Sequence, residues 1–297
     1  MKILCVGSLN IDCVYSVDHF VRAGETISST AFSQVPGGKG LNQTVALAKA
    51  GADVTHAGSV GNDGNLLRNT LRSAGVDDSL LCPSPIPTGH AIIQVDCDGQ
   101  NSIIVESGAN GTLSRAYLTS MLDSFAPGDI LLLQNETNEI PWLMEEGHRR
   151  KMTVVFNPSP VTPELKEYPL EYVNIFILNE IEGALLSGEN VTEKIPAALY
   201  SRYPNSKIML TLGGDGCVFF DGKHSVHQDA FRVKAVDTTA AGDTFTGFFL
   251  AGLTENLPIE YVLKMASAAS AIAVTQVGAS VSIPTRVEVE EFIRTNC

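Results

Sequence analysis

Short apolar segments alternate with amphipathic segments along most of this 297-residue chain. The apolar segments have the length of buried strands, and the amphipathic ones have the apolar spacing of helices. Such alternation is typical of a mostly parallel sheet, so we predict an α/β fold. The predicted strands span residues 3–7, 54–60, 130–134, 153–157, 175–178 and 208–212. The predicted helices span residues 40–50, 66–74, 114–122, 141–149, 181–187, 195–203, 242–253, 259–274 and 286–295.

Two stretches interrupt this alternation. Residues 13–32 have a strand-like polar and apolar pattern, and two further strands at 90–95 and 102–105 flank the glycine-containing turn 97–100. These pieces predict either a small sheet outside the main one, which could cover a site as a lid, or edge strands of the main sheet. No linker divides the chain, so we expect residues 1–297 to form a single domain.

The overall composition limits the kinds of partner that this protein can bind. The chain has 20 basic and 33 acidic residues, a net charge of −13, and no basic run, so we exclude a nucleic-acid partner. No apolar run approaches the ~18 residues of a membrane span, so we expect no membrane partner. Six cysteines are scattered without a Cys-x-x-Cys pair, which favours free thiols and a cytoplasmic localisation.

The clearest chemical signal is the segment 237–245, which reads Asp-Thr-Thr-Ala-Ala-Gly-Asp-Thr-Phe. Small residues lead into Gly242, Asp243 follows, and the apolar pattern of a helix begins. Free N–H groups at a helix N-terminus bind phosphate, and a carboxylate beside them can take a proton from a hydroxyl. This combination predicts phosphoryl transfer to an alcohol. The simpler alternative is that Asp243 only favours the first helical turn.

A second unusual segment is the string Gly-Gly-Lys-Gly-Leu-Asn-Gln at 37–43. Its glycines allow the backbone to approach a ligand closely, and Asn42 can hydrogen-bond a hydroxylated ligand. A Walker A loop needs Gly in place of Ser33 and Ser or Thr in place of Gly40, so the string is not one. It also lacks G-x-G-x-x-G, which disfavours a nicotinamide oxidoreductase. An ordinary loop is the alternative.

Polar residues also follow three predicted strands, at the edge where open α/β sheets bind ligands. Asn10 and Asp12 follow the first strand. Because they are two residues apart in an extended segment, both side chains can point the same way and hydrogen-bond a polyol. Glu182 follows the strand at 175–178 and could bind water on Mg²⁺. The glycine-rich turn 211–216 suits a nucleotide. Taken singly, each segment is also compatible with an ordinary turn.

Together these segments resemble the ribokinase (PfkB-type) family of sugar kinases. The strings that carry the resemblance are GSLNID at 7–12, GGKGLNQ at 37–43, QNE at 134–136, NPSP at 157–160, LNEIE at 178–182, TLGGDG at 211–216, VDTTAAGDTF at 236–245 and AIAVTQVGASVSIP at 271–284. They occur in the family's order over essentially the whole chain. The family implies a Rossmann-like, mostly parallel sheet with helices on both faces. It also implies a small β-sheet lid from about 13–33 and 88–106, which forms a homodimer contact.

The resemblance also implies transfer of the ATP γ-phosphoryl group to the primary hydroxyl of a sugar, with D-ribose giving ribose 5-phosphate. Asp243 corresponds to the catalytic base, and Ala240, Ala241 and Gly242 offer amides to the transferring phosphate. The positions that match sugar contacts are Asn10, Asp12, Gly38, Lys39, Asn42, Glu136 and Asp243. The positions that match nucleotide and Mg²⁺ contacts are Asn179, Glu182, Thr211, Gly213 and Gly216. The positions that match a monovalent-cation (K⁺) site are Asp237, Thr239, Ala273, Gln276, Gly278 and Ser282.

Some residues depart from the family pattern. Leu41 replaces a usual small residue, and Cys13 and His90 stand in lid strands where ordinary apolar residues are expected, which bears on sugar preference. Ser267 differs from the usual polar aromatic residue near the adenine. The alternatives are therefore a deoxyribose, fructose or nucleoside kinase of the same family, and a non-catalytic sugar-binding regulator. The low aromatic content of the lid disfavours a nucleoside, and Asp243 beside Gly242 disfavours the regulator.

Overall fold

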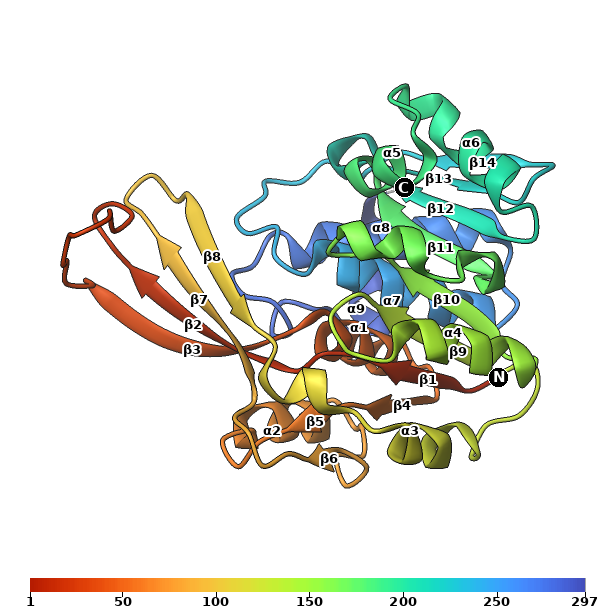
Figure 1. The fold of residues 1–297 in the computed structure, drawn as a ribbon. Helices are drawn as coiled ribbons and strands as arrows, with labels where there is room; N and C mark the ends of the chain where they lie inside the picture. Colours follow the sequence, from red (N-terminus) through yellow and green to blue (C-terminus); the bar gives the residue numbers. More distant parts are fainter. Residues whose placement is uncertain (297) are drawn as a thin grey trace.

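The computed structural model describes residues 1–296, and its largest sheet has eight strands in the order β14-β13-β12-β11-β10-β9-β1-β4 (Figure 1). The strands from β4 to β12 in this order pair in parallel, whereas β13 and β14 are antiparallel additions at one edge. The predicted mostly parallel α/β sheet is thus confirmed. The strands are β1 (Ile3–Val6), β4 (Val54–Ala57), β9 (Ile130–Gln134), β10 (Thr153–Asn157), β11 (Ile175–Asn179), β12 (Lys207–Thr211), β13 (Cys217–Phe220) and β14 (Ser225–Gln228).

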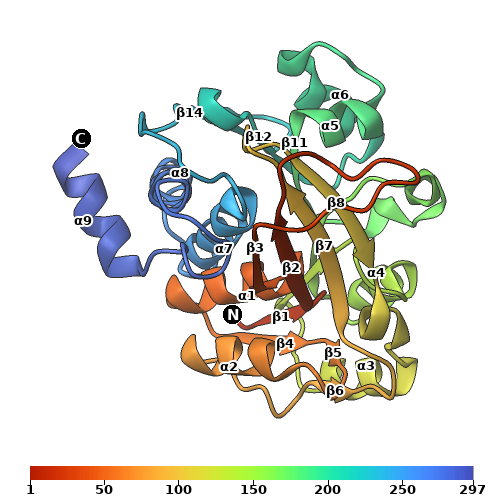
Figure 2. The same ribbon diagram turned by 90° about the vertical axis from the view of Figure 1, so that its left-hand side faces the viewer.

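Helices cover both faces of this sheet, as Figure 2 shows. Successive side chains of a strand point to opposite faces, so Ile3 and Cys5 join one apolar cluster and Leu4 and Val6 join the other. The first cluster includes α1 (Lys39–Lys49), α2 (Asn65–Ser73), α7 (Ala241–Thr254), α8 (Ile259–Ala273) and α9 (Arg286–Asn296). The second includes α3 (Arg115–Leu122), α4 (Ile140–Arg149), α5 (Glu180–Ser187) and α6 (Ile195–Arg202). Within residues 1–296, no helix has both the length and the apolar character needed to cross a membrane.

A separate four-stranded sheet, with the order β3-β2-β7-β8, projects from one side of the body (Figure 1). Its strands are β2 (Asn10–Ser16), β3 (Ala31–Gly37), β7 (Gly89–Val95) and β8 (Asn101–Glu106). The predicted small separate sheet is confirmed, and the alternative of edge strands in the main sheet is wrong. The pattern at 13–32 was misleading, because residues 17–30 form no regular strand and the paired strands extend outward to residues 10 and 37.

The strand predicted at 54–60 is interrupted at Gly58. Strand β4 ends where the Gly7 N–H donates to the Ala57 carbonyl (3.1 Å), and β5 (Ser59–Val60) then pairs with β6 (Cys82–Pro83) in a third sheet. A Cβ atom at Gly58 would lie 2.4 Å from Leu9 Cδ1 and 2.9 Å from the Gly7 carbonyl oxygen, so glycine lets the chain pass close to the end of β1 where it turns away. Short 3₁₀ segments complete the fold: η1 (Gly108–Thr112), η2 (Pro163–Glu167), η3 (Leu170–Tyr172), η4 (Thr192–Lys194) and η5 (Gly213–Asp215).

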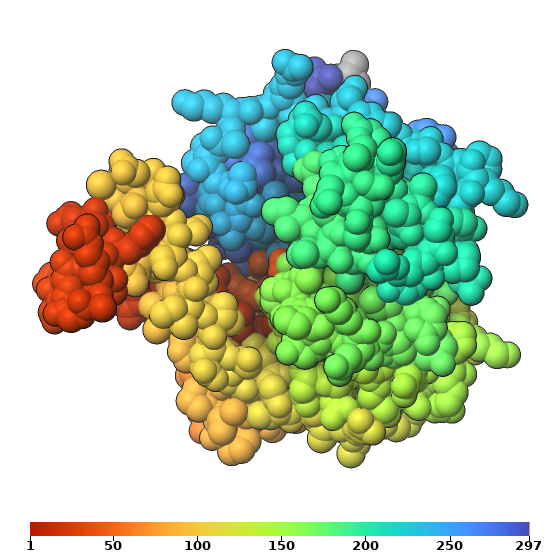
Figure 3. All heavy atoms as spheres, turned by 45° about the horizontal axis from the view of Figure 1, so that its top comes forward, coloured from red at the N-terminus to blue at the C-terminus, as the bar shows by residue number. Residues whose placement is uncertain are grey.

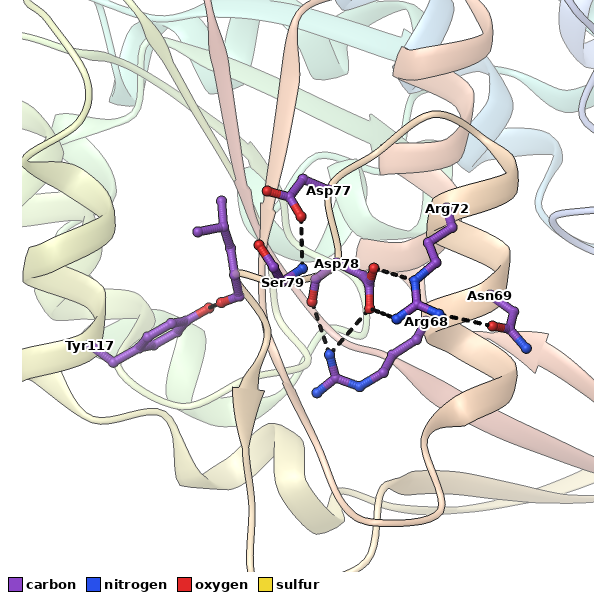
Figure 4. Close-up of polar contacts among 8 residues, drawn as sticks. Arg68, Asn69, Arg72, Asp77, Asp78, Ser79 and Tyr117 are labelled. Atoms are coloured by element: carbon purple, nitrogen blue, oxygen red, sulfur yellow. Dashed lines mark hydrogen bonds and ion pairs between the residues drawn. The ribbon is translucent and has the colours of Figure 1, made fainter.

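The loop that leads into β6 is fixed to helix α2 by a polar cluster (Figure 4). The Asp78 carboxylate accepts hydrogen bonds from Arg72 Nε (2.5 Å) and Nη2 (2.8 Å), and Arg68 Nη1 donates to the Asp78 carbonyl (2.9 Å). On the other side of the loop, the Tyr117 hydroxyl donates to the Leu80 carbonyl (2.9 Å). The Arg72 side chain is more than half exposed, so this cluster orders the loop more than it stabilises the fold.

Helices α1 and α7 pack in close contact at Gly247. A Cβ atom there would lie 2.3 Å from Ala46 Cβ and 2.8 Å from Leu47 N, so α7 touches the backbone of α1. This contact fixes the start of α7 beside the start of α1, and the two helix starts form the site described below.

We expect Gly247→Ala to reduce the free energy of unfolding by about 1–3 kcal/mol, because the added methyl group overpacks the α1–α7 contact. Urea denaturation measures the change. Gly242→Ala is the matched control in the same helix, since a Cβ atom at Gly242 meets nothing within 4 Å. Equal stabilities of the two variants would contradict the assigned packing.

Candidate active site

The N-terminus of helix α7 presents backbone amides that have no acceptor in the described part of the chain. Ala240 has a left-handed backbone (φ 59°), the Ala241 N–H donates to the Thr238 carbonyl (3.2 Å), and the Thr244 N–H donates to the Ala240 carbonyl (2.8 Å). Among residues 1–296, the N–H groups of Ala240, Gly242 and Asp243 have no hydrogen-bond acceptor. The helix dipole adds positive potential at this point, so the amides can bind an anion.

The Asp243 carboxylate lies beside these amides and is 6% exposed. Its Oδ2 accepts a hydrogen bond from Asn42 Nδ2 (3.1 Å), and its Oδ1 accepts one from Gln43 Nε2 (2.9 Å). Both donors come from the first turns of α1, so the structure brings the predicted residues Asn42 and Asp243 into contact.

A second carboxylate, Glu136, holds the start of α1. The Lys39 N–H donates to Glu136 Oε2 (3.0 Å), and the Ser8 hydroxyl donates to the same oxygen. Burial raises the pKa of Glu136 above its usual value, although the nearby Lys39 charge opposes this. Burial alone would lower the pKa of Lys39, but the carboxylates of Asp243, Glu136 and Glu182 outweigh burial and raise it. Lys39 is therefore a half-buried cation near three carboxylates.

Glycines allow the end of β1 and the start of α1 to touch. Gly38 has a φ of 94°, and a Cβ atom there would lie 2.9 Å from the Ser8 carbonyl oxygen. A Cβ atom at Gly40 would lie 2.4 Å from the Gly7 carbonyl carbon, so a side chain at Gly40 would push the helix away from the strand. This contact places Lys39 and Asn42 at the carboxyl edge of the main sheet.

Asn10 and Asp12 lie two residues apart on β2, on the same face of the projecting sheet. Asn10 Oδ1 accepts a hydrogen bond from Asn110 Nδ2 (2.7 Å), which leaves the Asn10 amide donors available. The Asp12 carboxylate lies over Gly37, where a Cβ atom would be 2.1 Å from Oδ2. Burial and the charge of Glu136 raise the pKa of Asp12 to about 6.

Three of the residues that depart from the family pattern, Leu41, Cys13 and His90, do not face this site. Leu41 is fully buried in the apolar cluster between α1 and the main sheet. Cys13 and His90 alternate with Asp12 and its partner Ala91, so they lie on the opposite face of the projecting sheet. The expectation that these three residues bear on sugar preference stays a prediction, and the structure places their side chains away from the candidate site.

Two adjoining cavities meet at the N-terminus of α7 and share Thr211, Thr238, Ala241 and Gly242. The polar cavity has a volume of about 240 Å³, and its lining includes Lys39, Asn157, Asn179, Glu182 and Asp243. The apolar cavity has a volume of about 330 Å³, and its lining includes Gly213, Gly216, Ala230, Phe231, Val233, Ser267, Ala271 and Val274. Figure 3 shows the surface hollowed between the yellow strands of the projecting sheet and the green and blue segments of the body.

Asn179 and Glu182 form a reciprocal cap at the start of α5. Glu182 N–H donates to Asn179 Oδ1 (2.9 Å), and Asn179 N–H donates to Glu182 Oε2 (3.0 Å). The cap holds the Glu182 carboxylate at the polar cavity. Gly213 opens toward the apolar cavity, whereas Gly216 is needed for packing, because a Cβ atom there would lie 2.0 Å from the Gln228 carbonyl oxygen.

The predicted cation-site residues lie in the loop before α7 and in the end of α8 with the loop that follows it, and the two segments contact each other. The Asp237 carboxylate accepts hydrogen bonds from the Thr239 N–H (2.9 Å), the Thr239 hydroxyl (2.6 Å) and the Gly278 N–H (2.9 Å). Burial opposes the charge of Asp237, but these hydrogen bonds lower its pKa. The Ala273 carbonyl accepts from Gln276 N–H (3.1 Å), and the Ser282 hydroxyl donates to Ala279 (2.8 Å).

Sequence reasoning missed two groups of site residues. The first group is the buried amides Gln43, Gln134 and Asn157 around Asp243. Gln134 and Asn157 are the last residues of β9 and β10, so the rule that ligands bind at the carboxyl ends of strands could have found them. The second group is the apolar wall at Ala230, Phe231 and Val233, which has no regular secondary structure and no local signal.

Comparison with known proteins places this geometry in a family. The family model for pfkB family carbohydrate kinases matches residues 1–286. Ribokinase of Bacillus subtilis is 36% identical over 301 residues, which cover 99% of this chain and 100% of that protein. The crystal structure of ribokinase from Thermotoga maritima superposes with a TM-score of 0.90 at 37% identity and covers 99% of both chains.

A further solved structure is Arabidopsis thaliana ribokinase complexed with ribose and ATP, with a TM-score of 0.86 at 29% identity. It covers 99% of this chain and 98% of that chain. The resemblance inferred from the sequence motifs is therefore confirmed, and this chain belongs to the pfkB family of carbohydrate kinases.

Proposed function

We propose that the protein transfers the γ-phosphoryl group of ATP to the primary hydroxyl of D-ribose and forms ribose 5-phosphate. The observation that carries this proposal is the buried Asp243 carboxylate beside the free Gly242 and Asp243 amides, at the junction of two cavities. The names of the ribokinase relatives support the choice of ribose and ATP.

Asp243 acts as the general base in this proposal. It accepts the proton of the sugar hydroxyl as the hydroxyl oxygen attacks the γ-phosphorus, and the bond from that phosphorus to ADP breaks. The free amides of Ala240, Gly242 and Asp243 bind the oxygens of the transferring group. The Ala241 amide contributes less to phosphate binding than the sequence motif predicts, because its N–H already donates to the Thr238 carbonyl.

The sugar lies, in this proposal, between the projecting sheet and the start of α1. Asn10 and Asp12 contact it from the sheet, and Gly38, Lys39 and Asn42 contact it from the body. Glu136 fixes the Lys39 backbone. The projecting sheet acts as a lid that excludes water from the reacting phosphate.

The affinity for ribose is expected to weaken as the pH falls below about 6, the pKa to which burial and Glu136 raise Asp12. The carboxylate accepts hydroxyl hydrogen bonds more strongly than the protonated acid, and about one tenth of it remains ionised one pH unit below the pKa. The KM for ribose should therefore rise about tenfold between pH 7.5 and pH 5. Asp12→Asn should have a high KM at both values, and a similar pH dependence in this variant would contradict the assignment.

ATP occupies the two adjoining cavities in this proposal. The apolar wall and Thr211, Gly213 and Gly216 surround the base, and the phosphates extend along the polar cavity to Gly242. The Glu182 carboxylate at that cavity suits an Mg²⁺ ion that keeps most of its waters, with Asn179 holding the carboxylate in place. When bound, Mg²⁺ would neutralise charge on the phosphates.

A monovalent cation, K⁺, is proposed for the loops at 236–239 and 273–282. The Ser280 hydroxyl there is 3% exposed and has no hydrogen-bond partner within residues 1–296, which fits a loop with spare oxygen ligands. Asp237, Thr239, Ala273, Gln276, Gly278 and Ser282 form the candidate set. Such a cation would add positive charge near the start of α7.

A homodimer through the lid is also proposed. Phe32, Ile92 and Ile104 are exposed on the face of the projecting sheet opposite Asp12, and Phe32 packs against Tyr15. An exposed apolar face of this kind marks a protein contact. Light scattering that gives a monomer mass at micromolar concentration would contradict this proposal.

The function is tested by a coupled assay of ADP formation with ribose, deoxyribose, fructose and adenosine, each with and without K⁺. We expect the highest kcat/KM with ribose and stimulation by K⁺. A higher kcat/KM with deoxyribose, fructose or adenosine than with ribose would identify a different kinase of the family. Sugar binding without ADP formation would instead indicate a regulator.

A further inference from the structure

Three buried amide side chains form a connected chain behind the Asp243 carboxylate. Gln43 Nε2 donates to Asp243 Oδ1 (2.9 Å) and to Asn157 Oδ1 (3.2 Å), and Gln134 Nε2 donates to Gln43 Oε1 (2.7 Å). Gln43 and Gln134 are fully buried, and Asn157 is 9% exposed. The three residues belong to α1, β9 and β10, so separate parts of the fold converge on one carboxylate.

At each end of this chain of amides lies a group that can only accept a hydrogen bond, and these two groups fix which way every amide turns. Asn157 Nδ2 donates to the Ile177 carbonyl (2.9 Å), which can only accept, so Asn157 must turn its oxygen toward Gln43. An ionised Asp243 also only accepts, so the Gln43 NH₂ group must face both oxygens. Gln43 Oε1 then points to Gln134, which must turn its own NH₂ group toward it.

We propose that Gln43 is a positioning residue for the base Asp243, and that Gln134 acts through Gln43 by holding its amide in the donating orientation. This inference rests on the proposed function, in which Asp243 takes the sugar proton. The carboxylate could otherwise rotate about its Cβ–Cγ bond. The donors Asn42 and Gln43 occupy one lone pair on each oxygen, so each oxygen keeps a free lone pair, and the Asp243 side chain lines the polar cavity.

The test of direct positioning is Gln43→Met, which keeps the length of the side chain and removes the donor. We expect kcat to fall about 10- to 100-fold while the KM for ribose changes less than about threefold, because a misplaced base affects the chemical step. The acid limb of the kcat–pH profile should move to higher pH, because a hydrogen-bond donor to the ionised carboxylate is lost. The titratable groups whose pKa the charge of Asp243 affects are Lys39, Glu136 and Cys5, and this variant retains all three.

Gln134→Met tests whether Gln134 acts through Gln43, because Gln134 has no hydrogen bond to Asp243 itself. We expect a smaller loss of kcat with a pH shift in the same direction. The double variant should be no slower than Gln43→Met alone, since Gln134 acts only through Gln43. Leu199→Ala, in a fully buried position of α6 on the other face of the sheet, controls for lost stability and should keep the wild-type pH profile.

Two kinetic outcomes would overturn the inference: a wild-type kcat–pH profile in Gln43→Met, or effects of the two variants that multiply in the double variant. A double-mutant cycle of Gln43→Met with Asp243→Asn on the unfolding equilibrium tests the contact without any substrate. A coupling of at least about fivefold in the unfolding equilibrium constant supports the contact between Gln43 and Asp243. Independent effects of the two substitutions overturn the inference. A wild-type enzyme inactive on every sugar would refute the proposed function, and the cycle would still decide the contact.

Discussion

Replacing Asp243 by asparagine is expected to lower kcat by at least about 10²–10⁴-fold, the usual loss when a general base is removed. The amide cannot accept the proton of the sugar hydroxyl. Its NH₂ group would also face one of the two donors, Asn42 Nδ2 or Gln43 Nε2, that now bind the carboxylate. Steady-state assays of ribose-dependent ADP formation measure the change.

The affinity for ATP should change little in the Asp243→Asn protein, because the free amides of Gly242 and residue 243 are retained. Asp229→Asn is a matched control, since the Asp229 side chain is 91% exposed and lines neither cavity. An Asp243→Asn protein with near wild-type kcat would refute the role assigned to this carboxylate.

The second large effect is expected from Gly242→Ala. A methyl group there meets no protein atom within 4 Å and extends into the space between the two cavities, where the phosphate is proposed to lie. The displaced phosphate should lose hydrogen bonds to the amides, and the loss of one such donor costs about 10²–10³-fold in kcat.

Gly242→Ala should leave stability unchanged or slightly raised, because alanine is the better helix former and no contact is strained. Comparing the activity and stability of this variant with those of Gly247→Ala separates an effect on phosphate binding from an effect on helix packing within the same helix. We expect Gly242→Ala to be stable and inactive, and Gly247→Ala to be less stable with its site intact. Wild-type activity of Gly242→Ala would show that no phosphate approaches this turn.

The boundaries of the regular elements were largely predictable from local pattern. The strands β9 and β10 were predicted with the same ends that the structure has, since each is a continuous apolar run bounded by polar residues. Gly58 was not recognised as the end of a strand, because the reason for the break is its contact with Leu9 and Gly7, which are distant in sequence. The strand-like pattern predicted at 13–32 is wrong for residues 17–30, because polar alternation also occurs in loops.

The candidate site was predictable where the residues stand in distinctive strings. Asp243 and Asn42 were both singled out, but their direct contact depends on the close packing of α7 on α1 at Gly247. Gln43 adjoins Asn42 in the same string, but nothing in the string shows that its side chain reaches the second oxygen of Asp243.

The sequence by itself determined the α/β class, the family and the helix start at which the carboxylate and amides adjoin, because these depend on neighbouring residues. Only the tertiary structure decided which polar groups surround that carboxylate and which side chains form the apolar cavity wall. Those contacts join residues as far apart as Gln43 and Asp243, and they arise from the packing of whole helices and strands, which no local pattern encodes.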